Sequence, residues 1–269
     1  MKKLATALVS AAAIMTMSTT AFAAENPAEV FDRVMEKNNT IQSAEIQSGV
    51  HSVILAKDVI PDGQMKVDMA MHAEMDMQDT TDLKYLAQVA SSILGQDSYS
   101  QVFYTDGYYY VDANGVKLKY PMPLEQIISS VQTGVNTSNM ESSYMKGISL
   151  NEVNGKRVLA YEANPKKLNK NVKEALGTVM NTLGTDINLD INIHEMKGAY
   201  VLDDNDYIIY MTNYIVYNME VLDQPMTCIT LMETEVQNPG EPVVVTLPST
   251  DGYEDLIGLY DGVIESEVE

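Results

Sequence analysis

Few side chains in this sequence are of types that could perform catalysis or bind a metal ion. The chain has three histidines (His51, His72 and His194) and a single cysteine, Cys228. Each histidine falls in a stretch that alternates apolar and polar residues, as a β-strand does, and lies on its polar side. We therefore interpret the histidines as solvated surface residues. Cys228 lies in an apolar strand-like run, where we expect a buried, inert thiol.

Known motifs do not supply a catalytic centre either. His194-Glu195 begins like a zinc-protease motif, but Gly198 stands where the second histidine is required. The acidic run at residues 203–206 lacks the Gly and the terminal Glu of an EF-hand, and a hairpin turn explains it better. The sequence contains no nucleophile-elbow, phosphate-loop or dinucleotide motif. We predict no catalytic residues, no metal ligands and no cofactor, and hence a protein that is not an enzyme.

Residues 65–77 form the most informative segment of the chain. Its odd positions are almost all apolar and mostly Met, whereas its even positions are nearly all polar. This alternation predicts a long strand with one continuous apolar face. Methionine is flexible and polarizable, and is common at surfaces that adapt to apolar partners of variable shape. Thioethers also suit Cu(I), but the alternation places His72 on the face opposite Met69 and Met71, so packing or an apolar pocket is favoured.

The N-terminus has the features of a secretory signal peptide. Lys2 and Lys3 precede an apolar stretch, and Ala21-Phe22-Ala23 fits the cleavage rule. We expect an exported, extracytoplasmic protein, without the cysteine that would anchor a bacterial lipoprotein. No later run approaches the length of a transmembrane helix. The formal charge of −21 argues against binding to nucleic acid or anionic headgroups, and one cysteine excludes a disulfide scaffold.

Periodicity and turn signals predict a chain that is rich in strands. Helices are expected over residues 27–38, 81–95, 123–131 and 165–183. Strands are expected over residues 43–57, 65–77, 99–104, 108–111, 116–120, 150–163 (a hairpin), 186–196, 198–202, 207–222 and 226–236. Hairpin turns are expected at Asp62-Gly63, Asp106-Gly107, Asn114-Gly115 and Asn154-Gly155. Residues 133–143 are polar and suggest a flexible connection.

The order of several short motifs resembles the LolA/LolB-like lipoprotein-carrier superfamily, most closely its secreted Gram-positive members of undefined function. These motifs are a helix at 27–38 before a long strand, Lys66-Val67-Asp68-Met69-Ala70-Met71, residues 104–111 with 115–119, and residues 243–248 followed by Gly252-Tyr253. The resemblance implies an incomplete antiparallel barrel whose concave apolar face is covered by helices and holds acyl chains. The chain lacks the anchoring cysteine and clustered basic residues of lipoprotein members, which argues against lipoprotein transfer.

We therefore predict a signal peptide (1–23) and one LolA-like α+β domain (24–269) with an acidic C-terminal tail. The domain is a strongly curved antiparallel sheet with helices on its concave face. The predicted function is secreted, non-catalytic binding or carriage of a lipid or acyl chain. The alternative is a structural or protein-interaction module of the cell envelope, with a filled core, no ligand and a protein partner that the sequence does not identify. The candidate ligand-binding residues are Met65, Val67, Met69, Met71, Met75 and Met77, with Ile46, Val50 and Ile54 from the preceding strand.

Overall fold

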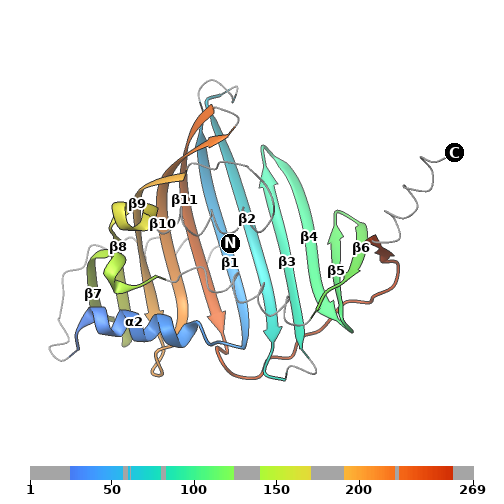
Figure 1. Cartoon of the computed structure of the whole chain (residues 1–269), viewed down its shortest axis with the longest axis horizontal. Helices are drawn as coiled ribbons and strands as arrows, with labels where there is room; N and C mark the ends of the chain where they lie inside the picture. Colours follow the sequence, from blue (N-terminus) through green and yellow to red (C-terminus); the bar gives the residue numbers. More distant parts are fainter. Residues whose placement is uncertain are drawn as a thin grey trace. The chain divides into compact units, whose positions relative to one another are not determined.

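The computed structural model (Figure 1) describes residues 25–256 apart from 57–59, 61, 80–82, 124–139, 171–190 and 222–223. Its helices are α2 (Pro27–Asn38), a 3-10 turn η1 (Ser142–Tyr144) and a helical segment at 165–170. Its strands are β1 (Ser43–Leu55), β2 (Gln64–Asp76), β3 (Lys84–Ile93), β4 (Gln96–Thr105), β5 (Tyr108–Ala113), β6 (Val116–Pro121), β7 (Met145–Val153), β8 (Lys156–Ala163), β9 (Ile191–Leu202), β10 (Ile208–Val221), β11 (Gln224–Gln237) and β12 (Glu254–Asp255).

The strands belong to one 12-stranded sheet in the order β12-β6-β5-β4-β3-β2-β1-β11-β10-β9-β8-β7. The sheet is antiparallel, except that β12 pairs with β6 in parallel, and it is not closed. The expected antiparallel, sheet-dominated fold is therefore confirmed. The expectation that helices cover a concave face stays a prediction.

The chain divides into two compact units. Unit 1 comprises the described residues of 1–38, 49–68 and 138–235, and unit 2 those of 39–48, 69–137 and 236–269. Strands β1 and β2 contribute residues to both units.

In unit 1 the helix α2 packs on one face of the sheet. Asn26 caps the helix, because its Oδ1 accepts a hydrogen bond from the backbone N of Ala28 at 3.1 Å. One side of α2 is apolar, and its residues Val30, Phe31, Val34 and Met35 are buried against β7–β10. The ring of Phe31 lies 5.7 Å from that of Tyr161 and 6.1 Å from that of Tyr200. The helix thus closes the core over this part of the sheet.

In unit 2 each face of the sheet carries a buried cluster. One face carries a cluster that includes Ala87 and Tyr104, together with Met75. The other face carries Leu86 and Phe103, and is covered by the extended C-terminal segment at 243–253 through Val243, Val245, Leu247 and Tyr253.

This two-sided burial explains why the helix predicted at residues 81–95 is wrong. Residues 81–95 were expected to be helical, but Lys84–Ile93 form the strand β3. Leu86 and Ala87 are neighbours in sequence and both are buried, on opposite faces of the sheet. Apolar residues at consecutive positions imitate the helical period, and they occur here because the strand is buried on both faces at Leu86 and Ala87, although Ala90 and Ile93 further along are exposed.

The other differences concern strand ends. Gly198 does not separate two strands, because β9 runs through it from Ile191 to Leu202. β4 and β7 begin earlier than expected, at Gln96 and Met145. The hairpin turns at Asp106-Gly107 and Asn114-Gly115 are confirmed, and both residues of each pair have the positive φ that such turns require.

Several predictions fall wholly or partly outside the described residues. These are the signal peptide, the helix at 123–131 beyond residue 123, most of the connection at 133–143, the helix at 165–183 beyond residue 170, residues 186–190 and the C-terminal tail. Asn164 caps the helical segment as expected, since its Oδ1 accepts a hydrogen bond from the backbone N of Lys166 at 3.1 Å. Among the described residues, no helix is long and apolar enough to cross a membrane.

Candidate functional site

The register of the β1–β2 hairpin fixes the direction of the Met-rich face in unit 1. The backbone N of Ala56 donates to the carbonyl of Gly63 at 3.1 Å, and Nδ1 of His51 lies 2.7 Å from Oδ1 of Asp68. Continuing this antiparallel pairing places Ile54 opposite Met65, and Ser52 opposite Val67. Because successive side chains alternate, these four residues lie on the face opposite the His51–Asp68 pair.

A hydroxyl pair connects this face to β11. Oγ of Ser52 lies 2.9 Å from Oγ1 of Thr230. Thr230 pairs with Ile215 of β10, and Cys228 pairs with Tyr217. Ile215 and Tyr217 pack against the same core cluster as α2. Ile54 and Met65 therefore share one face of the sheet with the core under the helix.

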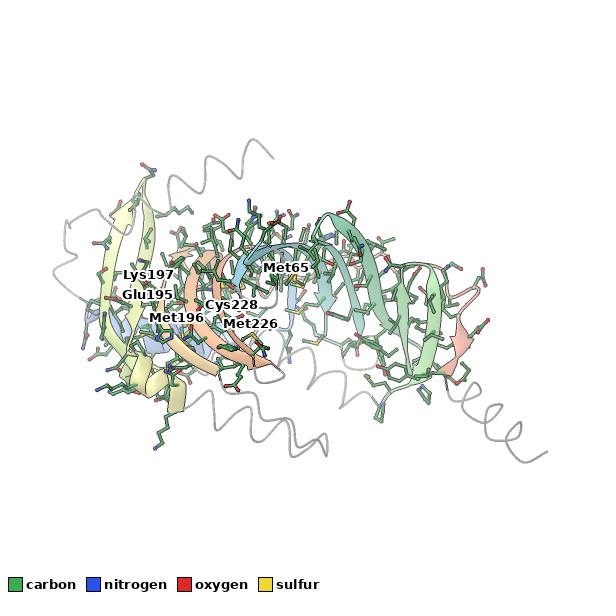
Figure 2. All side chains as sticks on the ribbon, turned by 90° about the horizontal axis from the view of Figure 1, so that it is seen from above. Met65, Glu195, Met196, Lys197, Met226 and Cys228 are labelled. Atoms are coloured by element: carbon green, nitrogen blue, oxygen red, sulfur yellow. The ribbon has the colours of Figure 1, made fainter. Side chains whose placement is uncertain are left out.

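Burial changes along this face. Leu159, Tyr200 and Leu202 pack in the core cluster that includes α2, and are at most 3% exposed. The residues of the face on β1, β2, β10 and the start of β11 are only half-buried. We call them the apolar face of unit 1: Val50, Ile54, Met65, Val67, Ile215, Tyr217, Met219 and Met226. Figure 2 labels Met65 on β2 and Met226 on β11.

The structure separates the residues that the sequence predicted as one site. Met65, Val67, Val50 and Ile54 lie on the apolar face of unit 1. The remaining predicted residues belong to unit 2, where Met69 and Met71 are 40% and 36% exposed, and Ile46, Met75 and Met77 are buried in the core. For the buried three, packing is the observed role.

Sequence reasoning missed the contribution of β10 and β11 to the face. Ile215, Tyr217, Met219 and Met226 were assigned to strands but not to the site. The strand pattern held no signal for them, because the register that places Met219 opposite Met226 comes from the pairing of β10 with a β11 that already begins at Gln224.

Residues 26–248 match the family described as "Family of unknown function (DUF6612)". The chain belongs to this family. No curated protein matches the sequence.

Solved structures resemble this DUF6612 chain only distantly. LprF from Mycobacterium bovis has a TM-score of 0.37 and 10% identity, covering 83% of this chain and 97% of its own. The Mycobacterium tuberculosis lipoprotein LppX has a TM-score of 0.36 and 9% identity, covering 82% and 100%. A β-barrel-like DUF1849 protein from Brucella abortus has a TM-score of 0.25 and 11% identity, covering 74% and 100%. At TM-scores below 0.5 these likenesses carry no argument about function.

The polar residues near the apolar face of the DUF6612 chain offer little chemistry. Ser52 and Thr230 hydrogen-bond to each other. Cys228 is 1% exposed, as expected for a buried thiol, and burial raises the pKa of this thiol. The histidines lie elsewhere: His51 and His72 contact carboxylates on the other face of their strands, and His194 is exposed. Within the described residues, no group of three or more His, Cys, Asp or Glu side chains is arranged to hold a metal ion.

Proposed function

We propose that this chain is a non-catalytic binding or carrier protein for a hydrophobic ligand, a lipid or an acyl chain. The observation that carries the proposal is the apolar face of unit 1. Its residues are as apolar as those in the core around α2 but stay half-exposed. A contiguous apolar surface that is left accessible commonly marks a binding site.

The chemistry of the face favours an apolar ligand. Its hydroxyls are already engaged, because Ser52 and Thr230 bond to each other and the Tyr217 hydroxyl bonds to Thr230 and Cys228. A polar ligand group placed there would therefore lose hydrogen bonds to water without replacing them. Met65, Met219 and Met226 supply flexible thioether side chains that can adjust to different chain shapes. We therefore expect the face to bind apolar ligands of different shapes, each with micromolar or weaker affinity.

The proposal also covers the localisation of the protein and its superfamily. We place the protein outside the cytoplasm, exported by the signal peptide at 1–23, as one domain over 24–269. We also place it in the LolA/LolB-like superfamily, as an incomplete barrel whose helices cover the concave face. The open antiparallel sheet and the packing of α2 on one face of unit 1 support this fold.

Displacement of a neutral apolar fluorophore tests the function. Fatty acids and phospholipids should displace it from the wild-type protein. Met65→Gln and Val67→Gln should each weaken the binding, because they place an amide on the apolar face. Lys66→Gln and Asp68→Asn change neighbouring side chains on the opposite face of the same strand, and should leave the binding unchanged.

The alternative is an envelope structural or interaction module with a filled core. The burial of Met75 and Met77 in unit 2 favours it, since Met residues there fill space rather than line a site. Native mass spectrometry of protein purified from its own host discriminates the two. A co-purified lipid supports the carrier. The absence of any lipid, together with no displacement by acyl ligands, supports the filled module.

A further inference from the structure

Three sulfur-bearing side chains adjoin one another on the β10–β11 hairpin. Met219 is directly opposite Met226, and Tyr217 is directly opposite Cys228. Residues 217 and 219 point to the same face of β10, as do 226 and 228 on β11. Met219, Met226 and Cys228 therefore occupy three corners of a four-residue block, and Tyr217 occupies the fourth. Figure 2 labels Met226 and Cys228 on β11.

Two of the sulfurs are already in contact. The thiol of Cys228 donates a hydrogen bond to Sδ of Met219, with the two sulfurs 3.6 Å apart. Two sulfur ligands that share one metal ion, each with a bond of about 2.3 Å at a near-tetrahedral angle, lie about 3.8 Å apart. The observed separation is close to that value, so one ion could bind both sulfurs with little rearrangement. Met226 lies across from Met219 and can supply a third ligand.

Ligand type selects the ion. A thiolate and two thioethers are soft donors, and soft donors favour Cu(I) over hard cations. The block contains no carboxylate or imidazole: its fourth residue, Tyr217, carries a phenol that hydrogen-bonds with the Cys228 thiol, and the next pair along the hairpin is Ile215 and Thr230. We propose that Cys228, Met219 and Met226 form a binding site for Cu(I).

Charge balance supports a monovalent ion. Cys228 is 1% exposed, and burial raises the pKa of its thiol, so a lone thiolate is unfavourable there. When Cu(I) binds, a Cu–S bond forms as the S–H bond breaks, one proton leaves for solvent, and no atom changes oxidation state. The bound unit is neutral. Zn²⁺ on the same ligands would leave one positive charge in apolar surroundings, which is costly.

This site differs from the copper cluster that the sequence suggested at Met69, Met71 and His72. Nε2 of His72 lies 3.2 Å from Oε1 of Glu45, on the polar side of its strand. The structure therefore does not bring that histidine to the methionines. The proposed site needs no histidine, and it does not rest on the binding of a lipid.

The test is an anaerobic titration of the purified protein with Cu(I) against a chromophoric Cu(I) chelator. The wild-type protein should take one Cu(I) from the chelator and show an ultraviolet thiolate-to-copper absorption. X-ray absorption should show only sulfur ligands, and excess Zn²⁺ should not displace the copper. Failure to compete with the chelator, or nitrogen ligands, would overturn the proposal.

Variants locate the copper. Cys228→Ser should abolish the absorption. Met219→Leu and Met226→Leu, which conserve volume, should each raise the Cu(I) dissociation constant about tenfold or more, equivalent to about 1.4 kcal/mol. Met232→Leu, on the same face of β11 but outside the block, is the matched control and should bind as wild type. If Cys228→Ser does not fold, the two Leu variants carry the test. Unchanged affinity in both would overturn the three-sulfur site.

Discussion

Met71 and Met75 project from the same face of β2, yet Met71 is 36% exposed and Met75 is 1% exposed. Both belong to unit 2, where Met75 packs in a core cluster with Ala73, Met77 and Tyr104. The two methionines share a residue type, a strand and a direction, and differ in what covers them.

This contrast gives a matched pair of substitutions. Met75→Ala should lower the free energy of unfolding by about 2–5 kcal/mol, because it leaves a cavity in a packed core. Met71→Ala should change it by less than about 1 kcal/mol, since its side chain is already in contact with water. Urea denaturation followed by circular dichroism measures both. Equal losses for the two variants would contradict the observed packing.

The alternation of apolar and polar residues predicted most of the strands, because a strand that is buried on one face has apolar residues at every second position. It failed at β3, where Leu86 and Ala87 are buried on opposite faces. Nothing local to residues 81–95 reports that the distant segment 243–253 covers the second face. The prediction of a helix there was wrong for that tertiary reason.

The sequence predicted which face of β2 carries the apolar side chains, but not which residues of the sheet belong to the site. The alternation of residues 65–77 placed Met65 and Val67 correctly on one face of β2. It could not show which parts of that face are packed, and it could not include residues from other strands. Met219 and Met226 join the face because β10 and β11 pair with each other in a particular register, which a single strand pattern does not contain.

Gly198 occupies a position on β9 that admits no side chain. It pairs with Tyr161 on one side and Asn213 on the other, and the Tyr161 hydroxyl donates to Oδ1 of Asn213 across it. A Cβ at residue 198 would lie 2.5 Å from the backbone oxygen of Thr212 and 2.8 Å from the Tyr161 hydroxyl.

We therefore expect Gly198→Ala to lower the free energy of unfolding by about 1–3 kcal/mol, since the added methyl overpacks the site and displaces this hydrogen bond. Gly147→Ala is the control, because a Cβ there meets nothing within 4 Å. It should be neutral or slightly stabilising. Chemical denaturation of both variants checks this, and a neutral Gly198→Ala would mean that the tyrosine hydroxyl is not held across Gly198.

Asp206 connects the turn before β10 to α2. Nε of Arg33 donates to its Oδ2 at 2.9 Å, and Arg157 donates to its Oδ1. Burial on its own raises the pKa of Asp206, but the hydrogen bond from Arg33 and the charges of Arg157 and Arg33 outweigh it, so the net pKa is lowered. Residue 206 has a φ of 66°, a conformation that Asn also adopts readily.

Asp206→Asn should thus remove the charge without straining the backbone. Because the folded-state pKa of Asp206 is depressed, its stabilisation is present above the unfolded-state pKa of about 3.9 and is lost as the pH falls through the folded-state value. We expect the free energy of unfolding of the wild type to exceed that of Asp206→Asn by about 1 kcal/mol at pH 7. The difference should shrink below about pH 4. Denaturation curves across this range measure it, and a difference that does not vary with pH would exclude the ion pair as its source.

Tyr109 lies in a row of four tyrosines across unit 2, since the register pairs Tyr85 with Tyr104, Tyr104 with Tyr109, and Tyr109 with Tyr120. Desolvation, assisted by the neighbouring Tyr85 and Tyr120, raises the pKa of Tyr109 to about 12. The folded state thus disfavours its phenolate. The stabilisation is fully present below the unfolded-state pKa of about 10 and is lost as the pH rises toward the folded-state value.

Spectrophotometric titration of the phenols tests this directly. Wild type should contain several phenols that ionise well above their ordinary pH, because burial also raises the pKa of Tyr161, Tyr200 and Tyr210. Tyr109→Phe should lose one phenol from this late component. Titration in concentrated urea is the control, because all phenols should then ionise near pH 10. Stability measured between pH 9 and about 12 should also decline less in Tyr109→Phe than in wild type. A wild-type titration that matches the urea titration throughout would show that the tyrosine row is solvated.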